Sequence, residues 1–219
     1  MKIMHIEAKS DVDVKKAVEK AVDKLPNKVG LVATIQFKHK LKDIKELLEE
    51  KGKKAVIGGQ ILGCDVSAAE KIKDKVDTFL YIGSGNFHPL SVALETGKKV
   101  VTANPLTNEV GRIKKKDIEK YKKQQRGALI KFLSSKKIGI LVSTKPGQER
   151  MKKALYLKKK LEAKGKECYI FLDNTLNPAE FENFPFIECW INTACPRFAD
   201  EKKGVINYEK VEEEIKRMD

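Results

Sequence analysis

KVGLVAT (residues 28–34) and KIGILVST (residues 137–144) are the two stretches that decide how this 219-residue chain is organised. Both contain a lysine, a glycine after one intervening residue and then Leu-Val-x-Thr, and both are rich in β-branched apolar residues, as buried strands are. Each leads through a helical stretch to a second apolar run that follows a Gly-Lys pair, in EKGKKAVIG (50–58) and AKGKECYIF (163–171). This internal repeat predicts two similar α/β domains.

Apolar and amphipathic runs alternate along both halves of the chain. The predicted strands are apolar throughout, which is typical of a parallel sheet covered on both faces. The predicted fold class is therefore α/β, with two similar domains, each a mainly parallel sheet flanked by helices. Strands are expected over residues 28–37, 54–59, 77–85, 98–105, 136–148 and 189–191, and helices over residues 10–25, 41–52, 67–75, 89–97 and 111–136, with a last helix at the C-terminus.

The chain is expected to divide into four parts. A long, highly charged stretch separates the two repeats and is interpreted as a helical connection. The predicted parts are a junction helix region over residues 1–26, an α/β domain with Cys64 over 27–112, the helical connection over 113–135 and an α/β domain with Cys195 over 136–219.

The chain carries a large excess of positive charge. It has 45 Lys and Arg against 31 Asp and Glu, which gives a net charge of +14. Such a surplus favours binding to nucleic acid or to a ribosome-associated partner, because binding releases counterions. The alternative is that the lysines are spread over amphipathic helices and form an ordinary solvated surface. No nucleic-acid-binding module or aromatic stacking motif accompanies the charge, so we do not expect direct nucleic-acid binding.

Neither a membrane span nor an export signal is expected. No apolar run approaches the roughly 20 residues that span a bilayer, and the first residues lack the apolar core of a signal peptide. We therefore expect a cytoplasmic protein. In that reducing compartment its four cysteines are not expected to form disulfides, and none belongs to a CxxC pair.

Candidate functional residues follow the predicted strands, because parallel sheets bind ligands beyond the carboxyl ends of their strands. Cys64 lies in one such loop, and Cys195 lies near Arg197 in another. A neighbouring guanidinium favours the thiolate, which is the form that binds soft metals and iron–sulfur clusters. The alternative is that both cysteines are small apolar residues that fill loop cores. Cys168 and Cys189 fall inside strands and are interpreted as core residues.

Two further loops carry polar groups. Ser84 and His88 belong to YIGSGNFHP (81–89), whose backbone amides suit an anion, with a polar residue at a helix start as the alternative. Lys145 and Gln148 belong to STKPGQER, at a strand end before a helix, and this position suits a carboxylate or phosphate. An ordinary turn with solvated charges is the alternative for that loop.

Several motifs together resemble the diphthamide-synthesis family, the archaeal 3-amino-3-carboxypropyl transferases that start the modification of a histidine in translation elongation factor 2. The resemblance runs from about Ile6 to the end of the chain. The motifs are GGQILGCD (58–65), FLYIGSGNFHPL (79–90), VVTANPLTNEV (100–110), STKPGQERMKKA (143–154) and INTACPR (191–197).

The resemblance implies three successive α/β domains, each of which gives one cysteine to a central 4Fe–4S cluster. S-adenosylmethionine binds the remaining iron, and its reductive cleavage yields a 3-amino-3-carboxypropyl radical that adds to the histidine imidazole. On this resemblance Cys64 matches the ligand of the second domain and Cys195 that of the third, and members act as dimers. The basic surface would suit an acidic face of elongation factor 2.

Position and charge suggest roles for the other candidates. Lys145, Gln148 and Arg197 are expected to hold the methionine carboxylate of the cofactor, because they combine charge or an amide with a strand-end position. Ser84 and His88 are expected to line the approach of the target histidine.

The chain departs from the family pattern in one respect. The family's first domain, with its own cysteine, has no counterpart, and MHIEAKSDVDVKKAVEKAV (4–22) looks like the junction that normally follows it. The chain is thus expected to be a fragment, a short member whose missing ligand comes from another subunit of a homo- or heterodimer, or a relative without catalysis. Two alternative functions stay open: a non-catalytic partner of a full-length synthase, and a basic ribosome- or RNA-binding module.

Overall fold

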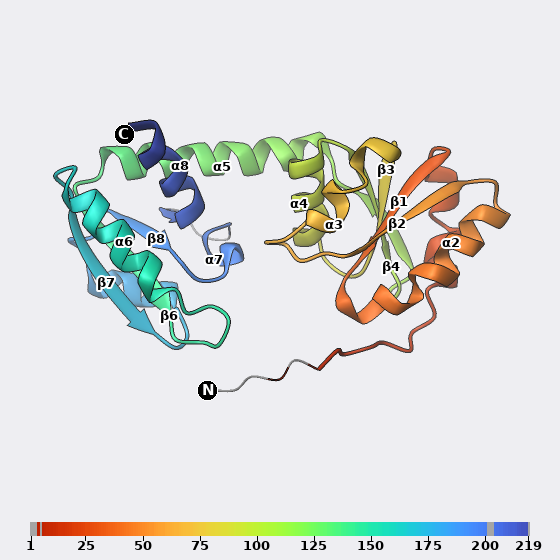
Figure 1. Ribbon diagram of the computed structural model, residues 1–219, viewed down its shortest axis with the longest axis horizontal. Helices are drawn as coiled ribbons and strands as arrows, with labels where there is room; N and C mark the ends of the chain where they lie inside the picture. The colour runs from red at the N-terminus through yellow and green to blue at the C-terminus, as the bar shows by residue number, and fades with distance from the viewer. Residues whose placement is uncertain (1–3, 5, 201–203, 219) are drawn as a thin grey trace. The chain divides into compact units, whose positions relative to one another are not determined.

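The computed structural model describes residue 4, residues 6–200 and residues 204–218. The chain divides into two compact units, Met1–Ile118 and Glu119–Asp219 (Figure 1). Each unit is built on its own sheet, with an apolar core on both faces of that sheet. The predicted α/β fold with two similar, mainly parallel sheets is confirmed. The finer division of the chain into four parts stays a prediction.

The first unit contains a five-stranded sheet in the order β2-β1-β3-β4-β5. Its strands are β1 (Lys28–Ala33), β2 (Lys54–Gln60), β3 (Thr78–Ile82), β4 (Lys99–Asn104) and β5 (Glu109–Arg112). Strands β1 to β4 are parallel, as their apolar runs predict, and β5 is antiparallel to β4. The sequence prediction missed β5, because its four residues EVGR contain a single large apolar side chain and show no strand pattern.

Helices cover both faces of this sheet, because alternate strand residues point to opposite sides. On one face α1 and α2 pack on a core that includes Leu31 and Leu80, and on the other α3 and α4 pack on a core that includes Phe79 and Tyr81. The helices are α1 (Lys15–Glu19), α2 (Leu41–Glu50), α3 (Ser67–Glu70) and α4 (Phe87–Thr96), with 3-10 turns η1 (Val22–Lys24), η2 (Ile35–Lys40) and η3 (Lys73–Lys75).

The first helix is shorter than the stretch predicted for it, residues 10–25. It begins at Lys15, because Asp13 Oδ1 accepts a hydrogen bond from Lys15 N at 2.9 Å. The side chain of Ser10 instead accepts a 3.4 Å bond from Val12 N and starts no helix. Asp13 therefore precedes the helix and satisfies one of its first free amides.

The second unit repeats the same topology. Its sheet has the order β7-β6-β8-β9, so its strands correspond in sequence to β2-β1-β3-β4 of the first unit, and all its pairs are parallel. The strands are β6 (Lys137–Ser143), β7 (Glu167–Asp173), β8 (Cys189–Asn192) and β9 (Val205–Asn207). The internal repeat in the sequence thus encodes two copies of one strand order.

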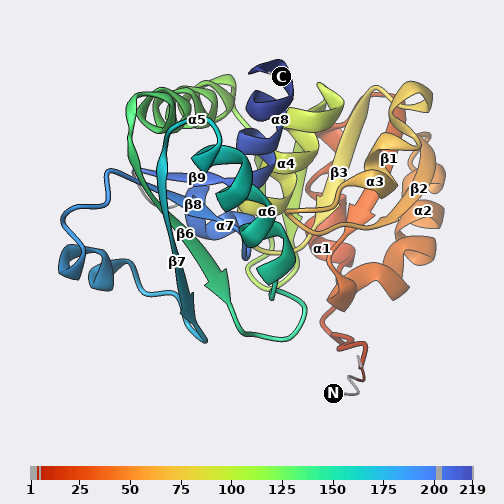
Figure 2. The same cartoon turned by 60° about the vertical axis from the view of Figure 1, so that its left-hand side comes forward.

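The two faces of the second sheet are covered differently (Figure 2). Helices α5, α6 and α8 pack on one face. On the other face α7 and η4 enclose an aromatic cluster around Trp190. The helices are α5 (Lys115–Ser134), α6 (Met151–Glu162), η4 (Pro178–Asn183), α7 (Pro196–Asp200) and α8 (Tyr208–Met218). Among the described residues, no helix combines the length and the apolar character that crossing a membrane requires.

The glycine of each repeat has a structural reason. Gly30 pairs with Phe79 of β3, and Gly139 pairs with Trp190 of β8. A Cβ atom on Gly30 would lie 2.7 Å from the Phe79 ring, and one on Gly139 would overlap the Trp190 ring. Each glycine therefore lets an aromatic side chain of the neighbouring strand lie across it, and this packing arrangement occurs in both units.

Candidate functional site

Cys64 lies on a tight turn beyond the carboxyl end of β2, before α3. Leu62 N donates to Asp65 O at 2.9 Å, and Asp65 N donates to Leu62 O at 3.3 Å. Gly63 and Cys64 therefore form the tip of this turn, where Cys64 is exposed. Asp65 Oδ1 accepts a hydrogen bond from Ser67 N at 3.0 Å, which lowers the pKa of Asp65 and ties the turn to the start of α3.

The loop after β3 packs against this turn. The ring of Phe87 lies so close to Gly63 that a Cβ atom on residue 63 would overlap it. His88 packs edge-on against Phe87 and parallel to Tyr81, with ring centroids 5.5 Å and 6.2 Å apart. Tyr81 OH donates to Ser84 O at 3.0 Å, and burial raises the pKa of Tyr81 to about 12. Ser84 and His88 thus lie at the same sheet edge as the cysteine turn.

Cys195 lies beyond the carboxyl end of β8, directly before α7. Asn192 Nδ2 donates to Cys195 O at 2.9 Å, and Asn207 Nδ2 donates to Pro196 O at 3.1 Å. Ala194 N donates to Asn192 Oδ1 at 3.1 Å. Both asparagines are buried, whereas Cys195 is partly exposed. The backbone of the cysteine loop is therefore held from inside the unit while the cysteine remains accessible.

The loop after β6 brings Lys145 and Gln148 to the same edge of the second sheet. Gln148 N donates to Lys145 O at 3.0 Å, and both residues are partly exposed. Beside this loop, Arg150 Nη1 and Lys153 Nζ donate to the hydroxyl of Tyr208 at 2.9 Å and 2.7 Å. Both cations also lie over its ring. The sequence analysis did not select Tyr208 as a candidate residue. Its position directly after the last strand of the sheet could have indicated it.

The candidate residues form one group on each unit. Cys64 follows β2, whose counterpart in the second unit is β7, whereas Cys195 follows β8, whose counterpart is β3. The two cysteines therefore lie at non-equivalent positions of the repeat. The first sheet's carboxyl edge carries Cys64, Ser84 and His88, and that of the second carries Cys195, Lys145, Gln148 and Arg197.

Residues 1–203 match the sequence profile of the diphthamide synthesis proteins. The chain belongs to that family. A 2-(3-amino-3-carboxypropyl)histidine synthase of Pyrococcus horikoshii is 37% identical over 185 residues, which are 80% of this chain and 52% of the relative. One of Methanocaldococcus jannaschii is 32% identical over 187 residues, which are 84% of this chain and 49% of the relative.

Solved structures of the diphthamide synthesis proteins have the same fold. The crystal structure of Dph2 from Pyrococcus horikoshii with a 4Fe-4S cluster matches with a TM-score of 0.81 and 33% sequence identity. The match covers 94% of this chain and 63% of that chain. Measured against the curated relatives above, the chain spans about half of their length, 52% and 49%.

The other two cysteines of this family member are core residues, as predicted. Cys168 and Cys189 are buried inside β7 and β8. Burial raises the pKa of both thiols to about 11, so both stay protonated at neutral pH. Within the described residues, no three His, Cys, Asp or Glu side chains gather as a metal site. Each unit therefore offers a single accessible cysteine, Cys64 or Cys195, at the carboxyl edge of its sheet.

Proposed function

We propose that this chain carries two domains of a 2-(3-amino-3-carboxypropyl)histidine synthase, a transferase of the first step of diphthamide biosynthesis. The proposed reaction moves the 3-amino-3-carboxypropyl group of S-adenosylmethionine to a histidine imidazole carbon of translation elongation factor 2. The observation that carries the proposal is the 37% identity over 185 residues to a Pyrococcus horikoshii protein of that name. The proposed location is the cytoplasm, where translation takes place.

Cys64 and Cys195 are the proposed ligands of a 4Fe–4S cluster. Their accessible positions in loops beyond sheet edges suit cluster ligation, whereas Cys168 and Cys189 are buried and protonated. A similar solved structure, that of Pyrococcus horikoshii Dph2, is named as containing such a cluster. When bound, the cluster supplies the electron for reductive, radical cleavage of S-adenosylmethionine.

The chain's own residues would bind and orient the reactants. Lys145, Gln148 and Arg197 combine two cations and one amide at the carboxyl edge of the second sheet, which suits the methionine carboxylate of the cofactor. Ser84 and His88 are proposed to line the approach of the target histidine. His88 is held in place by its ring contacts with Tyr81 and Phe87, so it would present a fixed imidazole.

A further cysteine ligand is proposed to come from another subunit, either a second copy of this chain or a related synthase chain. This proposal is supported by the accessibility of the four cysteines, because only Cys64 and Cys195 are open to a cluster and the resemblance implies three cysteine ligands. The same observation favours a second candidate function, in which the chain is a non-catalytic partner that supports a synthase subunit.

Two measurements test these functions. Iron and sulfide content after anaerobic purification should fall in Cys64→Ala and in Cys195→Ala and stay unchanged in the buried control Cys168→Ala. Equal iron content in all variants would contradict the ligand assignment. Transfer of labelled carboxypropyl groups from S-adenosylmethionine to elongation factor 2, with dithionite as reductant, tests catalysis. Transfer by this chain alone rules out the non-catalytic role. Transfer that needs an added synthase subunit and is lost in Cys64→Ala supports a supplied ligand, whereas transfer that is kept in that variant supports the non-catalytic role.

A further inference from the structure

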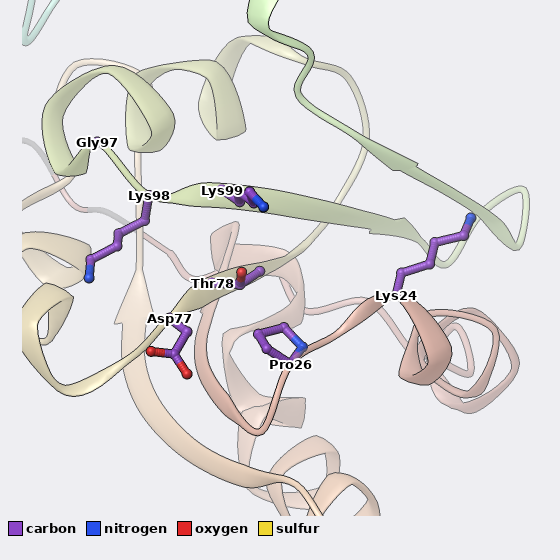
Figure 3. Close-up of a pocket in the computed structure, with 7 residues that line it drawn as sticks. All are labelled: Lys24, Pro26, Asp77, Thr78, Gly97, Lys98 and Lys99. Atoms are coloured by element: carbon purple, nitrogen blue, oxygen red, sulfur yellow. The ribbon is translucent and has the colours of Figure 1, made fainter.

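A groove lies on the first unit, at the sheet edge opposite to Cys64. It has a volume of about 1040 Å³, and every residue that lines it belongs to this unit. The groove takes in Thr78 and Lys99, at the amino ends of β3 and β4, whereas Cys64 follows the carboxyl end of β2. A hollow of about 500 Å³ shares Thr78, Lys24, Lys98 and Lys99 with it (Figure 3).

The groove is lined by six cations and no carboxylate. Figure 3 shows three of these cations, Lys24, Lys98 and Lys99, which come from η1, the α4–β4 connection and β4. Lys24 Nζ donates to Val110 O at 3.2 Å, and Asp77 is the carboxylate that lines the adjoining hollow (Figure 3). The full set is Lys24, Lys98, Lys99, Arg112, Lys114 and Lys115. Six cations in a groove whose lining contains no carboxylate attract an anionic partner.

Three partly exposed apolar side chains lie among these cations: Val110, Ile113 and Ile118. They come from β5, from the connection between β5 and α5, and from the start of α5. The aromatic residues Phe, Tyr and Trp are all absent from the lining. Ala93, Val100 and Val101 also border the groove, but all three are buried in the cores of the unit. The groove thus combines three partly exposed apolar side chains with a set of six cations.

We propose that this groove binds an acidic, amphipathic segment of a partner protein. Leucine-like side chains of the segment would cover Val110, Ile113 and Ile118, and its carboxylates would meet the six cations. Single-stranded RNA fits less well, because its bases stack on aromatic side chains and the lining offers none. This surface lies at the edge of the sheet away from Cys64, so its role does not depend on the proposed chemistry.

A labelled peptide of alternating glutamate and leucine tests the proposal on the full chain by fluorescence anisotropy. Lys98→Glu/Lys99→Glu should weaken its binding about tenfold or more, because two attractive charge pairs become repulsive. The matched control Lys51→Glu/Lys54→Glu changes two exposed lysines outside the groove by the same charge and should leave binding unchanged. Equal weakening in both double variants would overturn the proposal, because it would indicate attraction by net charge alone.

Two further comparisons address the chemistry of the ligand. A peptide in which serine replaces every leucine should bind about fivefold or more weakly, because it leaves Val110, Ile113 and Ile118 uncovered. Tighter binding of an oligouridine of equal charge than of the leucine peptide would overturn the assignment to protein. On the unaltered chain, the leucine peptide should protect Lys98 and Lys99 from acetylation, as read by mass spectrometry. Unchanged acetylation of both lysines would also overturn it.

Discussion

Asn192 Nδ2 donates a hydrogen bond to Asn207 Oδ1 at 2.7 Å in the interior of the second unit. The two residues end neighbouring parallel strands, β8 and β9. The same two side chains donate to Cys195 O and Pro196 O, so one buried amide pair holds two consecutive carbonyls of the cysteine loop. The position of this loop therefore depends on polar groups that lie beneath it.

Replacement of Asn207 by alanine should destabilise the second unit. Asn207→Ala removes the partner of Asn192 and leaves Pro196 O without its donor, which costs about 1–3 kcal/mol in the free energy of unfolding. Urea unfolding followed by the fluorescence of Trp190, the single tryptophan of the chain, measures the loss in this unit. Asn183→Ala, at an exposed asparagine of the same unit, is the control and should change stability by no more than about 0.5 kcal/mol. Equal values for both variants would contradict the prediction.

Alkylation should divide the four cysteines into two classes. Iodoacetamide at pH 8 should modify Cys64 and Cys195 in the folded chain, because the first is exposed and the second partly exposed. Cys168 and Cys189 should react only after unfolding, because both are buried and burial raises the pKa of each thiol to about 11. Peptide mass spectrometry before and after denaturation counts the labels. Rapid labelling of Cys189 in the folded chain would show that β8 is more accessible than the structure indicates.

Alkaline pH should destabilise the second unit through Cys189. Burial raises the pKa of this thiol from 9.0 to about 11, so the folded state binds the proton more tightly than the unfolded state does. This stabilising contribution is complete below about pH 9 and is lost as the pH rises through 11. Urea unfolding of the chain between these pH values should show a falling free energy. In Cys189→Ala the free energy of unfolding should fall less steeply with pH. In Cys64→Ala, at the exposed cysteine, it should fall as steeply as in the unaltered chain.

Two glycine substitutions should act in opposite directions. Gly139→Ala places a Cβ atom against the ring of Trp190 and should lower the free energy of unfolding by about 1–3 kcal/mol. Gly127 lies within α5 with no atom within 4 Å of a Cβ built on it. Gly127→Ala should therefore raise stability by about 0.5–1 kcal/mol through helix propensity. A neutral result for Gly139→Ala in urea unfolding would show that the Trp190 ring moves aside without cost.

Local pattern predicted most of the secondary structure. Residues 29–33 and 138–143 lie in strands and are all buried, and their apolar character is visible in the sequence. The prediction missed the edge strand β5, because its residues show no alternation of apolar and polar side chains. It also placed the start of the first helix at residue 10, whereas α1 begins at Lys15. The prediction that Cys168 and Cys189 are core residues was correct, because each belongs to an apolar run.

By itself, the sequence determined that the chain folds as two similar α/β units, because the repeat, its glycines and its apolar strands are local features. Only the tertiary structure decided that Cys64 and Cys195 follow non-equivalent strands and that Asn192 meets Asn207, 15 positions along the chain. It also decided that Tyr208 accepts hydrogen bonds from Arg150 and Lys153. The physical reason is that strand order and register bring these side chains together, and periodicity encodes which face is apolar but not which strands become neighbours.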